Sequence, residues 1–308
     1  MSMPQALQGR LKIPAIASPM FLVSGPDLVV ETCRSGVLGT FPALNQRTSE
    51  GYAAWLDEIE SRLQGVPNPA PYGVNLIVHK TNPRLDADLK ITVARKVPLV
   101  ITSLGAVPDL VKAVHSYGGL VFHDVISRRH AEKAVEAGVD GVIAVAAGAG
   151  GHAGTISPFA LVEEIRGFYD GTIVLAGAIS NGAQVAAAQL MGADLAYLGT
   201  RFIATKESMA QQGFKDMIVE ASTSDILYTP AISGVNANFL KPSILAAGLD
   251  PNNLAHVGKM DMEGEAKVWR DVWSAGHGVA SIKDVPGAAE LCDRLIAEYA
   301  AARASLAS

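Results

Sequence analysis

Short apolar runs alternate along this chain with longer segments whose apolar residues recur every three or four positions. The runs are apolar on both faces, which is typical of strands in a parallel sheet that is covered on both sides. Eight such runs lie at 13–18, 36–40, 72–78, 98–102, 119–122, 139–145, 172–175 and 194–198. A segment of helical periodicity follows each run, at 26–35, 48–63, 83–96, 107–117, 127–137, 158–168, 181–191 and 206–221. Eight strand-then-helix units predict an α/β fold, a closed (β/α)8 TIM barrel.

The alternation stops after residue 224. Residues 226–256 are rich in Pro, Gly, Ser and Asn, yet they include apolar residues such as Phe239 and Leu240. We interpret this segment as a lid that packs rather than as disorder. Two further helices are predicted at 263–274 and 285–299, and the last seven residues are expected to fray. The chain thus divides into a barrel, 1–224, and a lid insertion with C-terminal helices that pack on it, 225–308.

The sixth predicted strand leads into a glycine-rich loop, AGAGGHAG, that carries His152. Glycines such as Gly151 let backbone approach a ligand where a Cβ atom would collide. An imidazole in such a loop can exchange protons near neutral pH. The alternative, a turn with a solvated histidine, stays open at this point.

The loops after the last two strands present small residues. In barrels of this class these two loops commonly bind a phosphate through backbone N–H groups. Gly177 and Ala178 follow the seventh strand, and Gly199 and Thr200 follow the eighth. Because both loops show the pattern, a phosphate site is favoured over ordinary turn glycines.

The other strand ends face the same ligand in a barrel, and they supply Met20, Asn75 and Asp124. Asn75 is an amide within an apolar strand, so it needs a specific partner. A hydrogen bond to a neighbouring loop would also satisfy it. Asp124 has an alternative interpretation as a helix cap or as a surface charge.

Composition narrows the classes of partner. The net charge is −5, no basic block occurs, and aromatic residues make up 6%, which argues against nucleic acid. Cys33 and Cys292 are the only cysteines, which suits a reducing compartment and leaves no cysteine-based metal site. No metal motif, signal peptide or run long enough to span a bilayer is found, so we expect a cytoplasmic protein without metal and away from membranes.

Four segments together resemble one known family. AGAGGHAG, LAGAIS, YLGTRFIATKES and the tail KVWRDVWSAGHGVASI are similar to the nitronate monooxygenases, formerly called 2-nitropropane dioxygenases. That family also includes FMN-dependent NAD(P)H:quinone reductases and enoyl-acyl-carrier-protein reductases. The resemblance covers nearly the whole chain and is more specific to the family than to one activity within it.

The resemblance implies an FMN-binding barrel and assigns roles to the residues above. His152 matches the active-site histidine, near the reactive edge of the flavin. The expected cofactor site comprises Met20, Asn75, Asp124, Gly151, Gly177, Ala178, Gly199 and Thr200. Of these, Met20 and Asn75 match residues at the ring, Gly151 lies beside the flavin, and the last four hold the phosphate.

The implied reaction is the oxidation of an alkyl nitronate by O2 to a carbonyl compound and nitrite. His152 would remove the α-proton of a nitroalkane or stabilise the bound anion. The alternative is an NAD(P)H-dependent reductase of a quinone or enoyl substrate, and a phosphate-ligand barrel without redox chemistry is a third class. The oligomeric state stays open between a monomer and a homodimer.

Three departures from the family pattern concern the substrate more than the fold. Quinone-reductase-like members can carry Lys where this chain has Asp124, and a negative charge there disfavours an anionic flavin or a second phosphate-bearing cofactor. Many members have Gln where this chain has His277, which adds a titratable group. The phosphate loop has Ala178 in place of a second glycine.

Overall fold

The computed structural model describes residues 3–79, 81–105, 107–254 and 272–307. Its centre is a closed barrel in which all neighbouring strands are parallel, in the order β1-β2-β3-β4-β5-β6-β8-β9. The strands are β1 (Ala15–Ala17), β2 (Leu38–Pro42), β3 (Tyr72–Ile77), β4 (Leu99–Ser103), β5 (Leu120–Val125), β6 (Gly141–Val145), β8 (Thr172–Ala176) and β9 (Leu195–Leu198). The predicted (β/α)8 barrel is therefore confirmed.

Seven helices follow the first seven barrel strands as predicted. They are α1 (Pro26–Arg34), α2 (Ser49–Leu63), α3 (Leu85–Ala94), α4 (Pro108–His115), α5 (Arg128–Glu136), α6 (Pro158–Arg166) and α7 (Gly182–Leu190). Several begin at caps that the sequence supplies: Thr48, Ser127 and Asn181 each accept a hydrogen bond from a backbone N–H in the first turn. The predicted cap of α7, Ser180, is one residue too early.

The prediction of one helix at 206–221 is wrong for 206–211 and is confirmed for 212–220. The chain instead forms the short α8 (Thr200–Ile203) and, after a break, α9 (Gln212–Glu220). Between them the N–H of Lys206 donates to Pro286 O and that of Met209 donates to Val23 O. These N–H groups donate to other segments instead of to carbonyl groups within a helix, so tertiary contacts override the local helical pattern.

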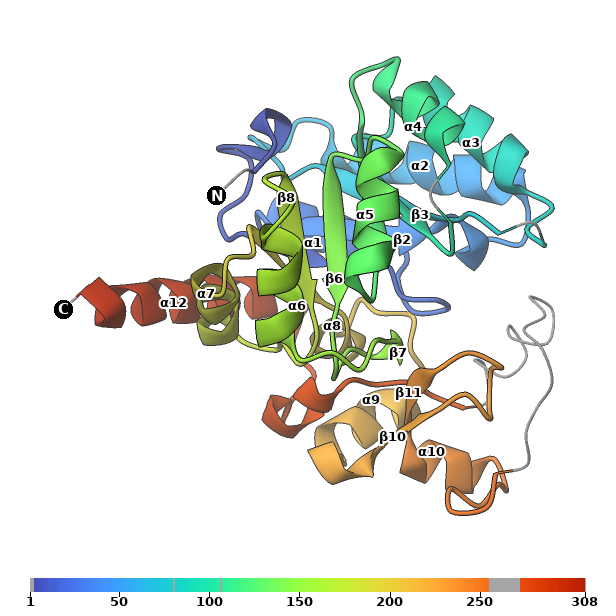
Figure 1. The fold of residues 1–308 in the computed structure, drawn as a ribbon, viewed down its shortest axis with the longest axis vertical. Coiled ribbons are helices and arrows are strands. Elements are labelled where there is room, and N and C mark those ends of the chain that lie inside the picture. Colours follow the sequence, from blue (N-terminus) through green and yellow to red (C-terminus); the bar gives the residue numbers. More distant parts are fainter. Residues whose placement is uncertain (1–2, 80, 106, 255–271, 308) are drawn as a thin grey trace.

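The segment predicted as a lid contains β10 (Ile226–Thr229), β11 (Ala237–Leu240) and α10 (Lys241–Ala246). The two strands form an antiparallel hairpin, and β11 also pairs with β7 (Gly151–His152), which gives a small sheet in the order β10-β11-β7. In Figure 1 this sheet lies with α8, α9 and α10 below the barrel strands, at the end to which β6 points. We call β10, β11 and the residues between them the lid hairpin, 226–240.

The C-terminal helix, α12 (Ala288–Ala307), packs on α7 and α1 and projects beyond α7 (Figure 1). It continues to Ala307, so the expectation that the last residues fray is wrong for 302–307. The helix predicted at 263–274 lies almost wholly outside the described residues. Short 3-10 turns complete the described fold at η1 (Gln5–Leu7), η2 (Ala43–Asn45), η3 (Thr223–Asp225) and η4 (His277–Ser281).

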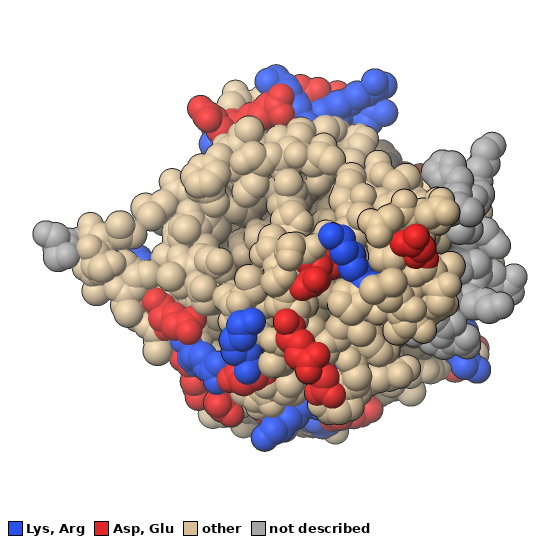
Figure 2. Space-filling model, turned by 90° about the horizontal axis from the view of Figure 1, so that it is seen from below, with Lys and Arg blue, Asp and Glu red and all other residues tan. Residues whose placement is uncertain are grey.

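The barrel interior is apolar along most of its length and polar at its mouth, the end formed by the C-terminal ends of the strands. Buried inward-facing residues fill it, among them Ile16, Leu38, Leu99, Ile101, Phe122, Ile143, Val174 and Leu195. Two residues beyond Ile101 and Phe122, on the same strand faces, come Ser103 and Asp124. The end of the molecule that lies lowest in Figure 1 is shown in Figure 2, where most of the surface carries neither acidic nor basic side chains.

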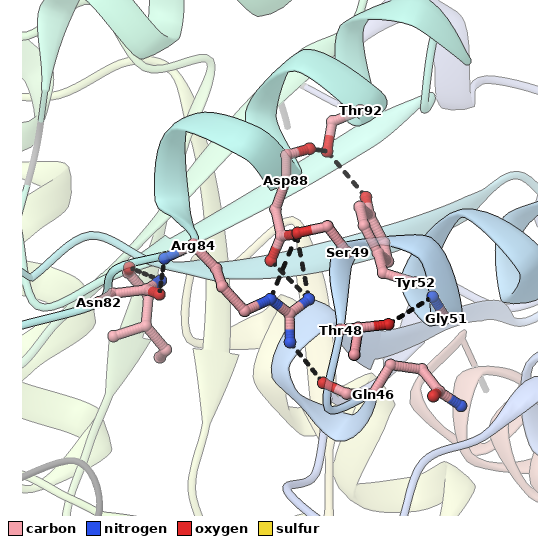
Figure 3. A network of polar contacts seen from close by, with 10 residues as sticks. Gln46, Thr48, Ser49, Gly51, Tyr52, Asn82, Arg84, Asp88 and Thr92 are labelled. Atoms are coloured by element: carbon pink, nitrogen blue, oxygen red, sulfur yellow. Dashed lines mark hydrogen bonds and ion pairs between the residues drawn. The ribbon is translucent and has the colours of Figure 1, made fainter.

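A buried polar network fastens the loop after β2 to the start of α3 (Figure 3). The Arg84 guanidinium donates to both carboxylate oxygens of Asp88, at 3.0 and 2.9 Å, and also to Gln46 O. Ser49 Oγ donates to the same carboxylate at 2.6 Å. Asn82 Nδ2 donates to Ile77 O at the end of β3, 2.9 Å away. The network therefore fixes the loops that flank the end of β3, two residues beyond Asn75.

Candidate active site

A chain of hydrogen bonds crosses the mouth of the barrel along three neighbouring strands. Asn75 Nδ2 on β3 donates to Ser103 Oγ on β4 at 2.8 Å and to Ile101 O at 3.2 Å. Ser103 Oγ in turn donates to Asp124 Oδ2 on β5 at 2.5 Å. Since a hydroxyl has one proton to give, this order fixes the direction of the chain toward the carboxylate.

Asp124 is the electrostatic centre of this mouth. Burial raises the pKa of its carboxyl from 3.8 to about 6, against the opposing effects of the Ser103 hydrogen bond and the His152 imidazole. Its other oxygen, Oδ1, is buried and accepts no hydrogen bond within the described part of the chain. A buried acceptor without a donor is the kind of atom that a bound ligand satisfies.

Tyr197 on β9 faces the same space as Asp124. Burial, and secondly the charge of Asp124, raise the pKa of this phenol well above its ordinary value, so Tyr197 stays a neutral hydroxyl. Asp124 therefore acts electrostatically on groups from two other elements, His152 of β7 and Tyr197 of β9. The Asp124 carboxyl can therefore exchange a proton near pH 6, whereas the Tyr197 hydroxyl keeps its proton.

The glycine loop after β6 places His152 on the two-residue strand β7, half-buried and paired with Ala237 of β11. Some of its glycines are required by the protein's own backbone. A Cβ on Gly150 would lie 2.9 Å from Gly276 N, and one on Gly154 would lie 2.8 Å from Val145 O. Gly151 has a positive φ of 68°, which favours glycine for conformational reasons. The close approach predicted for this loop is thus in part an approach to other backbone.

The loops after β8 and β9 meet the C-terminal tail. Ala178 adopts a φ of 56° and its N–H donates to Gly148 O at 3.3 Å. Thr200 Oγ1 accepts from Gly276 N at 2.9 Å, and His277 N donates to Gly148 O at 2.9 Å. The N–H of Ala178 is therefore engaged inside the protein, and the pairing of Ala176 with Tyr197 directs the N–H of Gly177 toward β9, whereas no described residue accepts a hydrogen bond from the N–H of Gly199.

Met20 lies in the loop after β1, beside Gly199. A Cβ on Gly199 would be 3.8 Å from Met20 Sδ, so the ends of β1 and β9 are in contact here. The backbone N–H of Met20 donates to Ser24 Oγ at 3.0 Å, and its carbonyl accepts from Asn45 Nδ2 at 3.0 Å. Both backbone groups of Met20 thus take part in the fold of this loop.

All nine sequence-predicted site residues lie at the C-terminal end of the barrel, in the loops or at the strand ends named above. Sequence reasoning missed Ser103 and Tyr197, although each lies two positions beyond an inward-facing residue of its own strand. It also did not connect Asn238 and Ser274 with the glycine loop, which both of them hold. His277, noted as a departure, lies in the tail with an exposed side chain.

A hollow of about 680 Å³ lies at the opposite end of the barrel. Its lining includes Arg10, Tyr72, Pro98 and Leu120, which come from the start of the strands and from the N-terminal segment. Active sites in (β/α)8 barrels occur at the other, C-terminal face, where the titratable cluster lies. We therefore place the site at the mouth around Asp124 and His152.

Comparison with known proteins defines the class. Residues 6–298 match the family model described as nitronate monooxygenase, and the chain belongs to that family. Its members are flavin-dependent oxidoreductases, so the protein is an enzyme of this class. No helix in the described ranges is long and apolar enough to cross a membrane.

The curated relatives are distant. The chain is 26% identical over 287 residues to a nitronate monooxygenase of Paraburkholderia phytofirmans, covering 78% of this chain and 76% of that protein. It is 25% identical over 249 residues to (3aS,4S,5R,7aS)-5-hydroxy-7a-methyl-1-oxo-octahydro-1H-indene-4-carboxyl-CoA dehydrogenase of Rhodococcus jostii, covering 80% and 66%. A Mycobacterium tuberculosis protein named as a monooxygenase, Rv1533, is 30% identical over 201 residues, covering 62% and 52%. The match thus spans only about half to two thirds of the length of the last two proteins.

Solved structures share the barrel over nearly its whole length. Nitroalkane oxidase from Streptomyces ansochromogenes has a TM-score of 0.84 at 25% identity, covering 98% of this chain and 100% of that one. FabK from Thermotoga maritima has a TM-score of 0.81 at 23% identity, covering 98% and 96%. At the latter identity the likeness concerns the fold alone.

The residues at the mouth fit a flavin. The buried Oδ1 of Asp124, which has no donor among the described residues, and the amide oxygen of Asn75 suit a ring system with N–H donors. The N–H of Gly199, which has no acceptor among the described residues, suits an anion, because the small residues of both loops leave the backbone accessible. The two sets of groups lie at different parts of the same mouth, as an elongated cofactor with a phosphate at one end requires.

Proposed function

We propose that the flavin is FMN and that the enzyme oxidises alkyl nitronates with O2 to a carbonyl compound and nitrite. The observation that carries this proposal is His152, held at the barrel mouth within electrostatic range of Asp124, in a chain of the nitronate monooxygenase family. Bound FMN would supply the electron-accepting chemistry that no side chain provides. The protein's residues bind, orient and exchange protons around it.

The cofactor contacts divide between the two parts of the mouth. The loops of Gly177 and Gly199 would hold the phosphate, with the N–H of Gly199 and the Thr200 hydroxyl as donors. Ala178 would shape this loop rather than donate to the phosphate, since its own N–H is engaged. Asn75 and Asp124 would accept hydrogen bonds from the ring, and Met20 and Gly151 would lie against it.

His152 would act on the substrate itself. Its imidazole would remove the α-proton of a neutral nitroalkane, or its N–H would donate to an oxygen of the bound nitronate anion. Either role needs the ring within hydrogen-bond distance of the substrate, about 2.6–3.2 Å. The three apolar side chains of Leu22, Leu104 and Ile126, each 37–40% exposed in loops after barrel strands, favour a substrate with small or medium alkyl groups.

One observation favours a second candidate, an NAD(P)H-dependent reductase of a neutral quinone or enoyl substrate. Above about pH 6 the Asp124 carboxyl is mainly ionised, and a buried negative charge repels an anionic nitronate. A neutral carbonyl substrate meets no such repulsion. The relation to the Rhodococcus dehydrogenase is consistent with this alternative.

An aerobic assay of the purified protein tests the proposal. With an alkyl nitronate and no NAD(P)H, we expect O2 uptake together with nitrite and carbonyl product in equal amounts. NADH or NADPH oxidation that depends on a quinone or enoyl acceptor, without nitrite formation from nitronate, would replace the first candidate by the second. A colourless protein that stays inactive after incubation with FMN would contradict both.

A further inference from the structure

The loop that carries His152 is fastened to the lid hairpin. Strand β7 pairs antiparallel with β11, with Ala237 opposite His152 and Asn238 opposite Gly151. Next to His152, the N–H of Ala153 donates to Asn236 O at 3.4 Å, and Tyr228 Oη donates to Ala153 O at 3.0 Å. The segment predicted as a cover for substrate is therefore also the support of the histidine.

Two side chains, those of Ser274 and Asn238, hold the glycine loop and the hairpin together, and we call this pair the clamp. Ser274 Oγ accepts from Gly151 N at 2.6 Å and donates to Asn238 O at 2.6 Å. Asn238 Nδ2 donates to Ala149 O at 2.7 Å. The clamp thus grips the glycine loop at two backbone atoms, one on each side of Gly150.

Asn238 is specialised for this contact. It is 2% exposed, and its Oδ1 is buried with no hydrogen-bond partner in the described part of the chain. Only the orientation that turns Nδ2 to the Ala149 carbonyl forms a hydrogen bond there. A buried acceptor left unpaired is unfavourable, so the contact of Nδ2 with the loop must offset that cost.

We propose that Asn238 and Ser274 are positioning residues, which act on His152 through the backbone of Ala149 and Gly151. The proposal rests on the proposed catalytic role of His152. A glycine-rich loop has little intrinsic preference for one conformation, since glycine loses more backbone freedom on folding than other residues do. The clamp provides the rigidity that the loop's own sequence lacks, so the hairpin sets the place of the imidazole as well as any cover over the substrate.

The test compares variants of the flavin-loaded protein. In Asn238→Ala, and independently in Ser274→Ala, we expect hydrogen–deuterium exchange of the amides in 149–153 to rise about tenfold, with α7 unchanged. We expect kcat to fall at least about tenfold and KM to change less than about twofold, because a displaced imidazole weakens the chemical step rather than binding. Ser274→Thr keeps the hydroxyl and should restore both values.

Asn236→Ala is the matched control, since it removes an exposed amide from the same hairpin and leaves the backbone bond to Ala153 in place. It should behave as wild type. The proposal is overturned if Asn238→Ala and Ser274→Ala match this control in exchange and in kcat, or if KM rises while kcat holds.

Failure of the proposed reaction is distinguishable from failure of the clamp. If wild type turns over no nitronate, the kinetic comparison is made with NAD(P)H and a quinone acceptor, and the exchange measurement needs no substrate. Faster exchange with unchanged kcat in the reaction that wild type does catalyse would make the clamp merely structural and would overturn the positioning role.

Discussion

The two halves of the candidate site are supported in different ways. Asn75, Ser103 and Asp124 lie on adjacent barrel strands, and the bonds that join them span 28 and 21 residues of sequence. The loop of His152 is held by bonds that span 89 and 123 residues, from the lid hairpin and the tail. The strand-borne half is thus fixed by the barrel core, whereas the loop-borne half depends on segments outside the barrel.

The largest expected effect concerns the loop-borne half. His152→Ala should lower kcat by about 10²- to 10⁴-fold, the usual contribution of a general acid or base. Flavin content should be unchanged, because the proposed cofactor contacts lie mostly elsewhere. Steady-state nitrite release and the flavin-to-protein absorbance ratio measure the two quantities.

His130→Ala is the control for this variant, since His130 is exposed on the outer helix α5. It should keep full turnover. Unchanged turnover in His152→Ala would remove the histidine from the mechanism, and loss of flavin would place it in the cofactor site instead.

The polar network of Figure 3 holds the loops that flank the end of β3, the strand that carries Asn75, and a substitution at Asp88 breaks it. Asp88→Ala should lower the free energy of unfolding by about 3 kcal/mol, because Asp88 is buried and its loss leaves the Arg84 guanidinium without its carboxylate. Urea unfolding measures the change. Asp109→Ala, which breaks an exposed pair with Lys112, should change it by less than about 0.5 kcal/mol; equal effects would contradict the buried role.

Asp124→Asn sharpens the electrostatic part of the comparison. The folded protein binds this proton more tightly than the unfolded chain, so the stabilisation is complete below about pH 4 and is lost as the pH rises through about 6. Wild type should therefore lose about 1 kcal/mol between pH 5 and 7.5 through this group, and the Asp124→Asn variant, which has no carboxyl to titrate there, should not. Urea unfolding of both proteins at the two pH values gives the difference.

Asp225 is the control for Asp124, because its pKa is shifted in the opposite direction. Hydrogen bonds from the backbone N–H and the hydroxyl of Ser222 lower the pKa of Asp225. Its stabilisation is present above the ordinary carboxyl pKa and is lost as the pH falls. Asp225→Asn should therefore destabilise the protein more at pH 7.5 than at a pH well below 3.8, and parallel behaviour of the two variants would show that burial does not govern Asp124.

The smallest effect is expected in the phosphate loop. Ala178 has a φ of 56°, a left-handed conformation that costs a residue with a Cβ about 1–2 kcal/mol. Ala178→Gly removes this strain but adds freedom to the unfolded chain, so a net stabilisation of about 0.5 kcal/mol is expected in thermal unfolding. A destabilised variant would show that contacts of the Ala178 methyl group outweigh the strain.

Local patterns were enough for most of the barrel. The strands are apolar on both faces because helices cover one side and the barrel interior the other, and this is visible within five or six residues. The polar residues at strand ends, Asn75 and Asp124, stand out against that background. Ser103 was missed because the predicted strand stopped one residue before it, and Tyr197 because it reads as one more apolar residue.

The remaining elements depend on partners far along the chain. Gly151 and His152 become a strand only because β11 lies beside them, and no two-residue segment carries such a signal. The helix predicted at 206–221 begins only at residue 212, because the residues before it bond to Val23 and Pro286. The engagement of the Ala178 N–H by Gly148 likewise follows from how two loops meet, which local periodicity does not reveal.

The most direct test of the central claim is the anaerobic absorbance spectrum of the purified protein, taken before and after addition of an alkyl nitronate and, separately, of NADH or NADPH. The account predicts an oxidised flavin spectrum that nitronate bleaches rapidly in wild type and far more slowly in His152→Ala, while nicotinamide acts slowly. Rapid bleaching by NADH or NADPH alone would contradict the nitronate assignment. The absence of a flavin spectrum after reconstitution with FMN would contradict the site itself.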